Sequence, residues 1–241
     1  LNMMINSQVH LSKFIELENN KLVERPNYYM IDKNISKSIE LNNISFKYFR
    51  SDEFIFEQLN LNIEKDKHTV ITGPNGSGKS TLLGIISRIF YPENGSVKIY
   101  SSKIGYVGVT PLIINGTLRE NFLYGNNQTI YDEEIIQLMN EFELFNSEQI
   151  NLDTIVDSKS LSSGQMQKIS FIRSLLFNVE LLLLDESTSN LDVETKNLIF
   201  KILKDKKITI INSTHNKDDF EYDYHLNISY SGEKRIIEYV K

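Results

Sequence analysis

One glycine-rich stretch has the residue types and the spacing that bind phosphate groups. It has a glycine, four further residues and then Gly-Lys-Ser, and it runs Gly73, Pro74, Asn75, Gly76, Ser77, Gly78, Lys79, Ser80 and Thr81. Glycines let the backbone turn so that successive N–H groups point inward, and a helix that begins near Lys79 adds the positive end of its dipole. The Lys79 ammonium would reach the β and γ phosphates, and the Ser80 hydroxyl would be a ligand of a magnesium ion shared with them. The stretch therefore predicts a cradle for a nucleotide polyphosphate.

A glycine-rich turn without a ligand would have the same composition, so the flanking residues decide between the two interpretations. Residues 68–72 are typical of a short buried strand, and the apolar residues 82–86 suit a buried helix. A strand before such a loop and a helix after it form the context in which the loop binds phosphate. We therefore favour the nucleotide cradle.

A second group of polar residues follows strands predicted farther along the chain. The apolar run Leu181 to Leu184 is typical of a strand buried on both faces of a parallel sheet, and Asp185 and Glu186 follow it directly. Two carboxylates at the end of a buried strand cost free energy if they bind nothing, so we expect them to act on a ligand. His215 comes soon after another predicted strand, where a lone histidine is more often structural.

Composition narrows the class of protein. With 241 residues the chain is long enough for one large or two small domains with a substantial core. A net charge of −6 gives no sign of the basic surface that a nucleic-acid partner would need. The absence of cysteine excludes disulfides and thiolate metal sites and suits a reducing cytoplasm. No apolar run approaches the roughly 18–20 residues of a membrane span.

The elements that must position these residues follow from the alternation of apolar and polar side chains. Four early strands are expected, at residues 39–48, 54–63, 96–100 and 103–107. The later elements are a mainly helical block, a buried strand, a helix, another strand and edge strands in the tail, at residues 117–177, 181–184, 193–204, 208–212 and from 220 onward. Thr117 and Asp132 both resemble capping residues at helix starts. This order predicts an α/β fold with a mostly parallel central sheet, an N-terminal antiparallel β layer and a helical subdomain at about residues 118–177.

One further motif makes the pattern specific. It lies immediately before a helical run and reads Leu161, Ser162, Ser163, Gly164 and Gln165. Together with the phosphate loop, the acidic pair and the segment ending at His215, in this order and spacing, it resembles the ATP-binding domain of ABC transporters. The signature Leu-Ser-x-Gly-Gln is the specific element, because phosphate loops and acidic strand ends occur in many unrelated ATPases. The resemblance covers about residues 39–215.

The resemblance implies an ABC-type ATPase fold of the P-loop NTPase class, with ATP and Mg²⁺ as ligands and a second copy of the domain as partner. Each ATP would lie between the phosphate loop of one copy and the signature of the other, in a head-to-tail dimer. Ser162 and the Gly164 N–H, at a helix start that favours anions, would bind the γ-phosphate from across the dimer. Ser163 and Gln165 belong to the same signature, and Asp192 would respond to the other copy across the interface.

The resemblance also implies a role for each residue around the phosphates. Asp185 would hold magnesium through its water shell, and Glu186 would orient the attacking water and accept its proton. His215 would contact the γ-phosphate, and its spacing from Glu186 favours this role over a structural one. Lys79 would stabilise charge on the transferred phosphate, and Tyr48 matches the aromatic position that stacks on the base.

Some segments resemble the exporter branch of the family, above all the run from Tyr106 to Gly125. Residues 1–37, expected to form a short helix and a linker, resemble the arm that follows the last membrane helix there, and residues 38–241 would be the ATPase domain. The implied partners are transmembrane domains outside this sequence, and the implied location is the cytoplasmic face of the cell membrane. The implied function is ATP hydrolysis that powers export.

Three departures from the family pattern affect this interpretation. Val109 occupies the position of a glutamine that contacts magnesium and senses the membrane domains, and valine cannot bind a metal. Ser163 replaces the first glycine of the signature, which we expect to have little effect. The segment between Thr154 and Leu161 is shorter than in exporters, so coupling to the membrane domains is expected to be unusual.

Two other functions compete with transport. A non-transport ABC ATPase of the DNA-repair or translation-factor kind is disfavoured by the lack of long heptad insertions, of a second ATPase copy and of a basic surface. A regulatory domain that binds ATP but hardly hydrolyses it is suggested by Val109. Retention of Lys79, Asp185, Glu186 and His215 argues against complete loss of hydrolysis.

Overall fold

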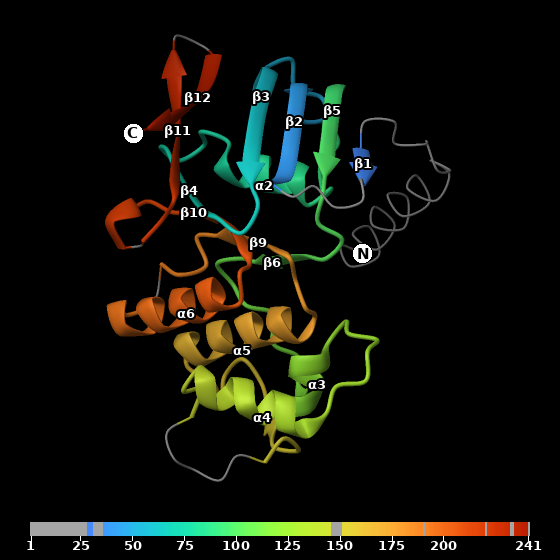
Figure 1. Cartoon of the computed structure of the whole chain (residues 1–241), viewed down its shortest axis with the longest axis vertical. Helices are drawn as coiled ribbons and strands as arrows, with labels where there is room; N and C mark the ends of the chain where they lie inside the picture. Colours follow the sequence, from blue (N-terminus) through green and yellow to red (C-terminus); the bar gives the residue numbers. More distant parts are fainter. Residues whose placement is uncertain are drawn as a thin grey trace, which may run out of the picture.

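The computed structural model describes residues 28–30, 36–145, 151–189, 191–219, 221–231 and 234–240. Its four-stranded and six-stranded sheets lie mainly in the upper part of Figure 1, and the helical subdomain lies below them. The smaller of these sheets has four strands in the order β1 (Tyr28–Met30), β5 (Asn94–Ile99), β2 (Lys37–Phe46) and β3 (Phe56–Glu64). Strand β2 pairs antiparallel with both β3 and β5. The three strands β5, β2 and β3 form the predicted antiparallel β layer, and β1 adds to it by pairing parallel with β5.

The larger sheet contains six strands. Their order is β12 (Lys234–Val240), β11 (Tyr224–Ser231), β4 (His68–Thr72), β10 (Thr209–Ser213), β9 (Leu181–Asp185) and β6 (Ile104–Val107). All neighbouring pairs are parallel except β11 with β12. The prediction of an α/β fold with a mostly parallel sheet is therefore confirmed.

Strand β9 shows why a continuous apolar run was needed at the centre of this sheet. Successive side chains of a strand point to opposite faces. Leu181 and Leu183 pack in the cluster that contains helix α2 (Lys79–Ile86) and the antiparallel sheet. Leu182 and Leu184 pack in the second cluster, with helices α5 (Ser163–Leu176) and α6 (Val193–Asp205). Because both faces are covered, every β9 side chain before Asp185 is apolar.

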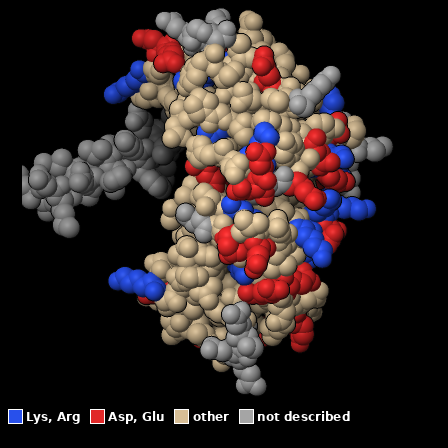
Figure 2. Space-filling view, turned by 90° about the vertical axis from the view of Figure 1, so that its left-hand side faces the viewer, with Lys and Arg blue, Asp and Glu red and all other residues tan. Residues whose placement is uncertain are grey.

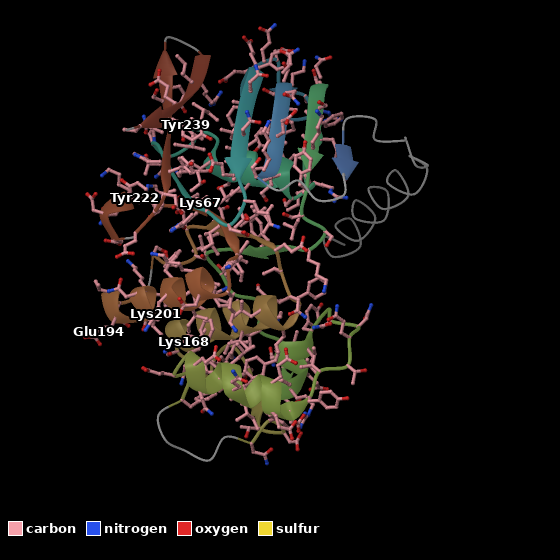
Figure 3. The ribbon with its side chains drawn as sticks, in the orientation of Figure 1. Lys67, Lys168, Glu194, Lys201, Tyr222 and Tyr239 are labelled. Carbon is pink, nitrogen blue, oxygen red and sulfur yellow. The ribbon has the colours of Figure 1, made fainter. Side chains whose placement is uncertain are left out.

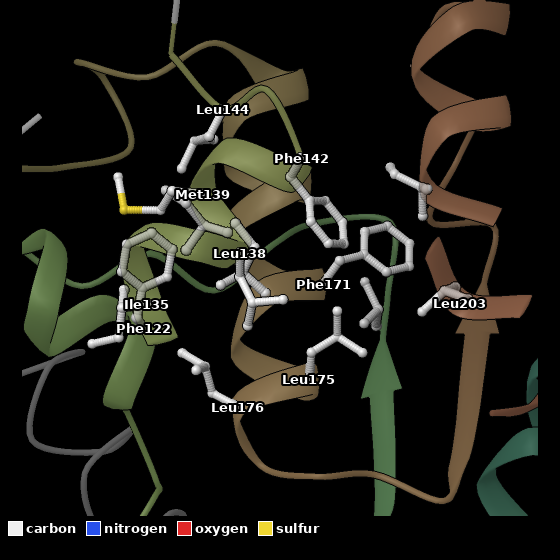
Figure 4. Packing of buried hydrophobic residues seen from close by; sticks show 14 of the residues in the cluster. Phe122, Ile135, Leu138, Met139, Phe142, Leu144, Phe171, Leu175, Leu176 and Leu203 are labelled. Atoms are coloured by element: carbon white, nitrogen blue, oxygen red, sulfur yellow. The ribbon is translucent and has the colours of Figure 1, made fainter. Parts of the chain in front are cut away.

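The second cluster extends into the helical subdomain. Helices α3 (Leu118–Leu123) and α4 (Asp132–Glu141) pack on α5, and Figure 4 shows this contact from close by. Phe142, just after α4, stacks against Phe171 of α5 with ring centroids 6.5 Å apart. The three helices lie within the predicted residues 118–177, but the block is not wholly helical, because β7 (Gly116–Thr117) pairs with β8 (Ile155–Val156).

Two local predictions about helix starts have different outcomes. Thr117 caps α3 with a capping box, in which Glu120 is the reciprocal partner. The prediction for Asp132 was wrong, since α4 is preceded by Tyr131 and has no side-chain cap. Asp132 instead pairs with Arg119, whose guanidinium lowers the pKa of that carboxyl. Asp132 at the start of α4 thus forms an ion pair with Arg119 and does not cap the helix.

The ends of the chain match expectation only in part, since β12 is the edge strand that was predicted in the tail. Strand β11 is not an edge strand, because it lies between β4 and β12, with Leu226 and Ile228 fully buried. Tyr239 of β12, labelled in Figure 3, donates a hydrogen bond to the Asn62 carbonyl of β3. Within the predicted arm, residues 28–30 form β1, while the predicted helix lies outside the described residues.

Candidate nucleotide-binding site

The glycine-rich loop joins β4 to α2 and has a backbone shape that only glycine permits. Gly76 and Gly78 have φ of 78° and 106°. At Gly73 an added Cβ would lie 2.5 Å from the carbonyl oxygen of Ile228, on β11. Gly78 caps α2 in a left-handed conformation without a side-chain cap, so the first N–H groups of the helix remain available. The loop therefore has the donors and the shape of an anion cradle.

Lys79 is buried beneath this loop. Its Nζ donates hydrogen bonds of 2.9 Å and 3.3 Å to the carbonyls of Gly73 and Pro74. It also lies 3.9 Å from Glu186 Oε1. The neighbouring Ser77 hydroxyl is fully buried and has no hydrogen-bond partner. A buried cation and an unpaired hydroxyl at one loop are suited to a phosphate group, which would satisfy both.

Asp185 accepts hydrogen bonds from three hydroxyl groups. Ser80 and Ser213 donate to Oδ1 over 2.9 Å and 2.8 Å, and Tyr106 donates to Oδ2 over 2.8 Å. Ser213 is opposite Asp185 in the pairing of β10 with β9. Burial and the contact with Asp185 raise the pKa of Tyr106, so its hydroxyl remains a donor. The carboxyl ends of neighbouring parallel strands thus converge on one carboxylate.

The chemistry of these groups fits a hard divalent cation. The Ser80 hydroxyl and the Asp185 carboxylate supply oxygen atoms within hydrogen-bond distance of each other. The described residues contain no group of three or more His, Cys, Asp or Glu side chains that could hold a metal by themselves. Mg²⁺ is usually bound by one or two protein oxygens together with phosphates and water. The residues present fit Mg²⁺ bound with a nucleotide.

Glu186 and His215 form a pair next to Lys79. His215 Nε2 lies 2.9 Å from Glu186 Oε1. Glu186 has a φ of 50°, a left-handed conformation that costs a non-glycine residue roughly 1–2 kcal/mol. Such strain persists where surrounding structure imposes it and is frequent at functional sites. The backbone turn directs this carboxylate toward Lys79 and His215.

The signature residues form the start of α5. Ser162 and Gln165 make a reciprocal capping box, so the Ser162 hydroxyl accepts a bond from the Gln165 N–H. Ser162 and Ser163 are exposed, and Gly164 is partly exposed. Helix α5 and helix α2 pack in clusters on opposite faces of the six-stranded sheet. Among the hydrogen bonds of the described residues, none joins the signature to the phosphate loop of the same chain.

Asp192 lies at the start of the next helix. Its carboxylate accepts bonds from the backbone N–H and the hydroxyl of Thr195 and caps α6, and these bonds lower its pKa. The side chain is exposed. The structure therefore gives Asp192 a capping role, and its predicted response to a second copy remains a prediction.

Tyr48 lies two residues beyond the end of β2, beside the end of the phosphate loop. Its hydroxyl is 2.7 Å from the Thr81 hydroxyl, and its ring meets those of Phe46 and Phe90 edge-on, with centroids 5.2 Å and 5.4 Å apart. The side chain is 40% exposed. A held, half-exposed ring next to the loop is suited to stacking on a base.

Val109 is on the surface, 45% exposed, and follows the end of β6. Its backbone carbonyl accepts a bond of 3.1 Å from Nε2 of Gln167, a buried residue of α5. With this exposure, Val109 does not pack in the core. The segment after β6 is tied to the signature helix through its backbone.

Comparison with known proteins identifies the family. The model of the family described as ABC transporter matches residues 56–189, which include the phosphate loop, the signature and the acidic pair. The chain belongs to the ABC transporter family. Its fold is that of the ATP-binding domain of these transporters.

Several curated ABC proteins are similar in sequence. The ATP-dependent permease MDL1 of Candida albicans is 34% identical over 75% of this chain and 30% of its own length. ABC transporter B family member 18 of Arabidopsis thaliana is 35% identical over 78% of this chain and 17% of its own length. The chain thus spans less than a third of either relative. A solved structure of a bacterial Atm1-family ABC exporter with ATP bound shares the fold, with a TM-score of 0.76 and 22% identity over 92% of this chain and 42% of that one.

Sequence reasoning missed three residues of this ABC site. Tyr106 and Ser213 both bind Asp185, and Gln167 holds the backbone at Val109. Ser213 precedes Thr214 and His215 in a segment that was recognised, and its position at a strand end could have suggested the contact. No spacing signal marks Tyr106, because its position depends on how β6 pairs with β9.

Substitutions of Tyr48 test its predicted contact with adenine. Tyr48→Ala should weaken ATP binding by about 1–3 kcal/mol, because stacking of a ring on a base is lost. Tyr48→Phe keeps the ring and loses only the contact with Thr81, so its effect should be much smaller. Calorimetric titration of ATP into each variant measures this difference. Equal losses from both changes would contradict stacking and indicate a hydroxyl contact.

Proposed function

We propose that this domain binds and hydrolyses ATP with Mg²⁺ and thereby powers export across a membrane through transmembrane partner domains. The observation that carries the proposal is the contact of Ser80 with Asp185, 2.9 Å apart, beside the pair formed by Glu186 and His215. These contacts at the ends of neighbouring strands support the proposal that Ser80 and Asp185 bind a metal next to Glu186 as the base. In-line attack of water on a γ-phosphate requires both.

Each residue then has a specific task in the reaction. Lys79 exchanges the loop carbonyls for phosphate oxygens and stabilises their charge. Mg²⁺, when bound, neutralises charge on the phosphates, and Ser80 and Asp185 are the residues that would hold it. Glu186 orients a water molecule and accepts its proton. His215, whose Nε2 lies 2.9 Å from Glu186 Oε1, keeps that carboxylate in place and contacts the γ-phosphate. A head-to-tail second copy supplies Ser162 and the Gly164 N–H.

Relatives support export as the work that this hydrolysis drives. The curated matches are named as a permease and as transporters, and the solved structure is an ABC exporter. No helix among the described residues is long and apolar enough to cross a membrane. On the strength of these relatives, we propose that transmembrane domains of the same or a partner chain complete the transporter and hold this domain at the cytoplasmic face.

A nucleic-acid function has less support. The face in Figure 2 carries acidic and basic side chains interspersed, and its described residues form no continuous basic patch there. The two curated relatives described above are named as a permease and as a transporter. Transport is therefore preferred over a non-transport ATPase.

The function is tested with the purified 241-residue chain and with its full gene product. The chain should hydrolyse ATP only with Mg²⁺, and the rate per chain should rise with protein concentration because each site needs two copies. A rate per chain that is independent of concentration would contradict the shared site.

The second experiment uses the full gene product. It should be extracted from cell membranes only by detergent, and its recovery in the soluble fraction would contradict transport.

Val109 should limit the rate of hydrolysis. Glutamine at this position could offer an amide oxygen to magnesium or the attacking water, whereas valine offers only methyl groups. Val109→Gln should therefore raise turnover several-fold, which corresponds to about 1 kcal/mol in the barrier. Because the side chain is 45% exposed, the melting temperature should not fall. The rate of ATP hydrolysis and the melting temperature, both measured on the same preparation of Val109→Gln, check this expectation.

The matched control is Val193→Gln, a change at a valine that is 62% exposed on α6. It should alter neither quantity. A lower melting temperature of Val109→Gln without any gain in turnover would show that the segment has been rebuilt around valine.

A further inference from the structure

The Tyr106 hydroxyl is a polar group that the proposed reaction does not yet use. Tyr106 lies on β6 opposite Leu183 of β9, so its side chain starts two residues before the level of Asp185. Its hydroxyl nevertheless reaches Asp185 and donates to Oδ2 over 2.8 Å. The side chain is 42% exposed, so nothing in its own packing requires this contact.

The contacts of Asp185 show what this hydroxyl contributes. Both serine hydroxyls bind Oδ1, and Tyr106 is the donor to Oδ2. Donors on both oxygens prevent the carboxylate from rotating. Ser80 is also the residue whose hydroxyl would bind the metal, so its hydrogen bond is not a fixed support. Ser213 and Tyr106 are then the two supports that do not themselves bind the cation.

The position of Tyr106 relative to Val109 adds a second argument. Val109 lies three residues later on the same segment and offers no polar side-chain atom to this edge of the sheet. The contact that Val109 makes here is through its backbone carbonyl, which accepts a hydrogen bond from Gln167 of α5. Within this segment, the polar side-chain contact with Asp185 is therefore made by the Tyr106 hydroxyl.

We infer that Tyr106 is a positioning residue, whose hydroxyl holds the Asp185 carboxylate in the orientation that binds Mg²⁺ with the nucleotide. The inference rests on the proposed function. Partners that orient a metal ligand typically contribute ten-fold or more to metal affinity. A carboxylate that is already oriented loses less conformational freedom when the metal arrives.

Tyr106→Phe tests this role because it removes one oxygen atom and keeps the ring. The measurement is calorimetric binding of the imido analogue of ATP to the full chain, first in EDTA and then over a series of Mg²⁺ concentrations. Half-saturation by Mg²⁺ should require an about ten-fold higher concentration in the variant. Affinity in EDTA should stay unchanged, because the phosphate loop is intact.

Tyr131→Phe is the matched control, at a tyrosine that is 71% exposed before α4. It should behave as the unmodified chain. An unchanged Mg²⁺ requirement in Tyr106→Phe would overturn the inference, and so would an equal loss of affinity in EDTA, which would indicate a general effect on the loop. Nucleotide binding that is independent of Mg²⁺ in the unmodified chain would contradict the proposed function itself.

Discussion

Glu186→Gln should lower ATP hydrolysis by about 10²–10⁴-fold while ATP still binds. Glutamine keeps the shape of the side chain and can still meet His215, but it cannot accept a proton from water. The loop, Lys79 and Asp185 are unchanged, so binding should persist. Because bound ATP would no longer be cleaved, the two-copy state should accumulate. Single-turnover hydrolysis and the molecular mass in solution with ATP measure these effects.

Glu194→Gln is the control for loss of a carboxylate. Glu194 is exposed in the first turn of α6 and is labelled in Figure 3. Its replacement should leave the rate within about two-fold, since an exposed charge at a helix start contributes only about 0.3–1 kcal/mol to stability. Unchanged turnover in Glu186→Gln, or loss of ATP binding, would exclude Glu186 as the general base.

Ser163→Asp should abolish hydrolysis by a different route. Ser163 is the first residue of α5 and is exposed. A carboxylate there favours the helix, because the N-terminal end of a helix dipole is positive. The same charge would repel the γ-phosphate presented by a second copy. ATP binding and melting temperature should therefore be preserved, while the dimer fails to form and activity falls by at least 10²-fold, about 2.7 kcal/mol.

Ser163→Asn separates charge from size in this experiment. Asparagine has nearly the shape of aspartate without its charge, and it should retain most activity. If Asn and Asp variants are equally inactive, the effect is steric and gives no support to phosphate binding by the signature.

Mixing two inactive variants tests the head-to-tail arrangement directly. A Ser163→Asp chain has an intact phosphate loop, and a Lys79→Ala chain has an intact signature. A mixed dimer would contain one complete site, so activity should return on mixing. If the mixture stays as inactive as its components, each site is built within one chain and the proposed partner contact is wrong.

The residues of the site differ in how readily the sequence predicts them. The loop around Lys79 and the signature at Ser162 are contiguous in the chain, so their composition and spacing are visible directly. Asp185 was predictable because polar residues directly after a buried strand must lie at the carboxyl edge of the sheet. Tyr106 depends on the register between two strands that are far apart in sequence, which no local pattern contains.

The fold shows the same division between local and long-range information. The apolar run of β9 predicted a strand covered on both faces, and packing in two separate clusters confirms it. The tail from residue 220 onward was predicted as edge strands, because its apolar and polar residues alternate only weakly. Its inner strand is instead buried beside β4, where Ile228 approaches Gly73. The alternation of apolar and polar residues is a property of one strand, and it does not show which other strands pair with that strand.

The order of strands also determines when the site can exist during synthesis. Strand β4 pairs with β10 and β11, both of which follow the whole helical subdomain in the chain. Ser80 meets a carboxylate 105 residues farther along. On the ribosome, the phosphate loop therefore emerges long before its partners, next to a strand with both edges unpaired, which is a state prone to aggregation. The contact of Ser80 with Asp185 therefore forms only after these distant strands have joined, and a ligand that needs both groups would stabilise the folded chain over its incomplete forms.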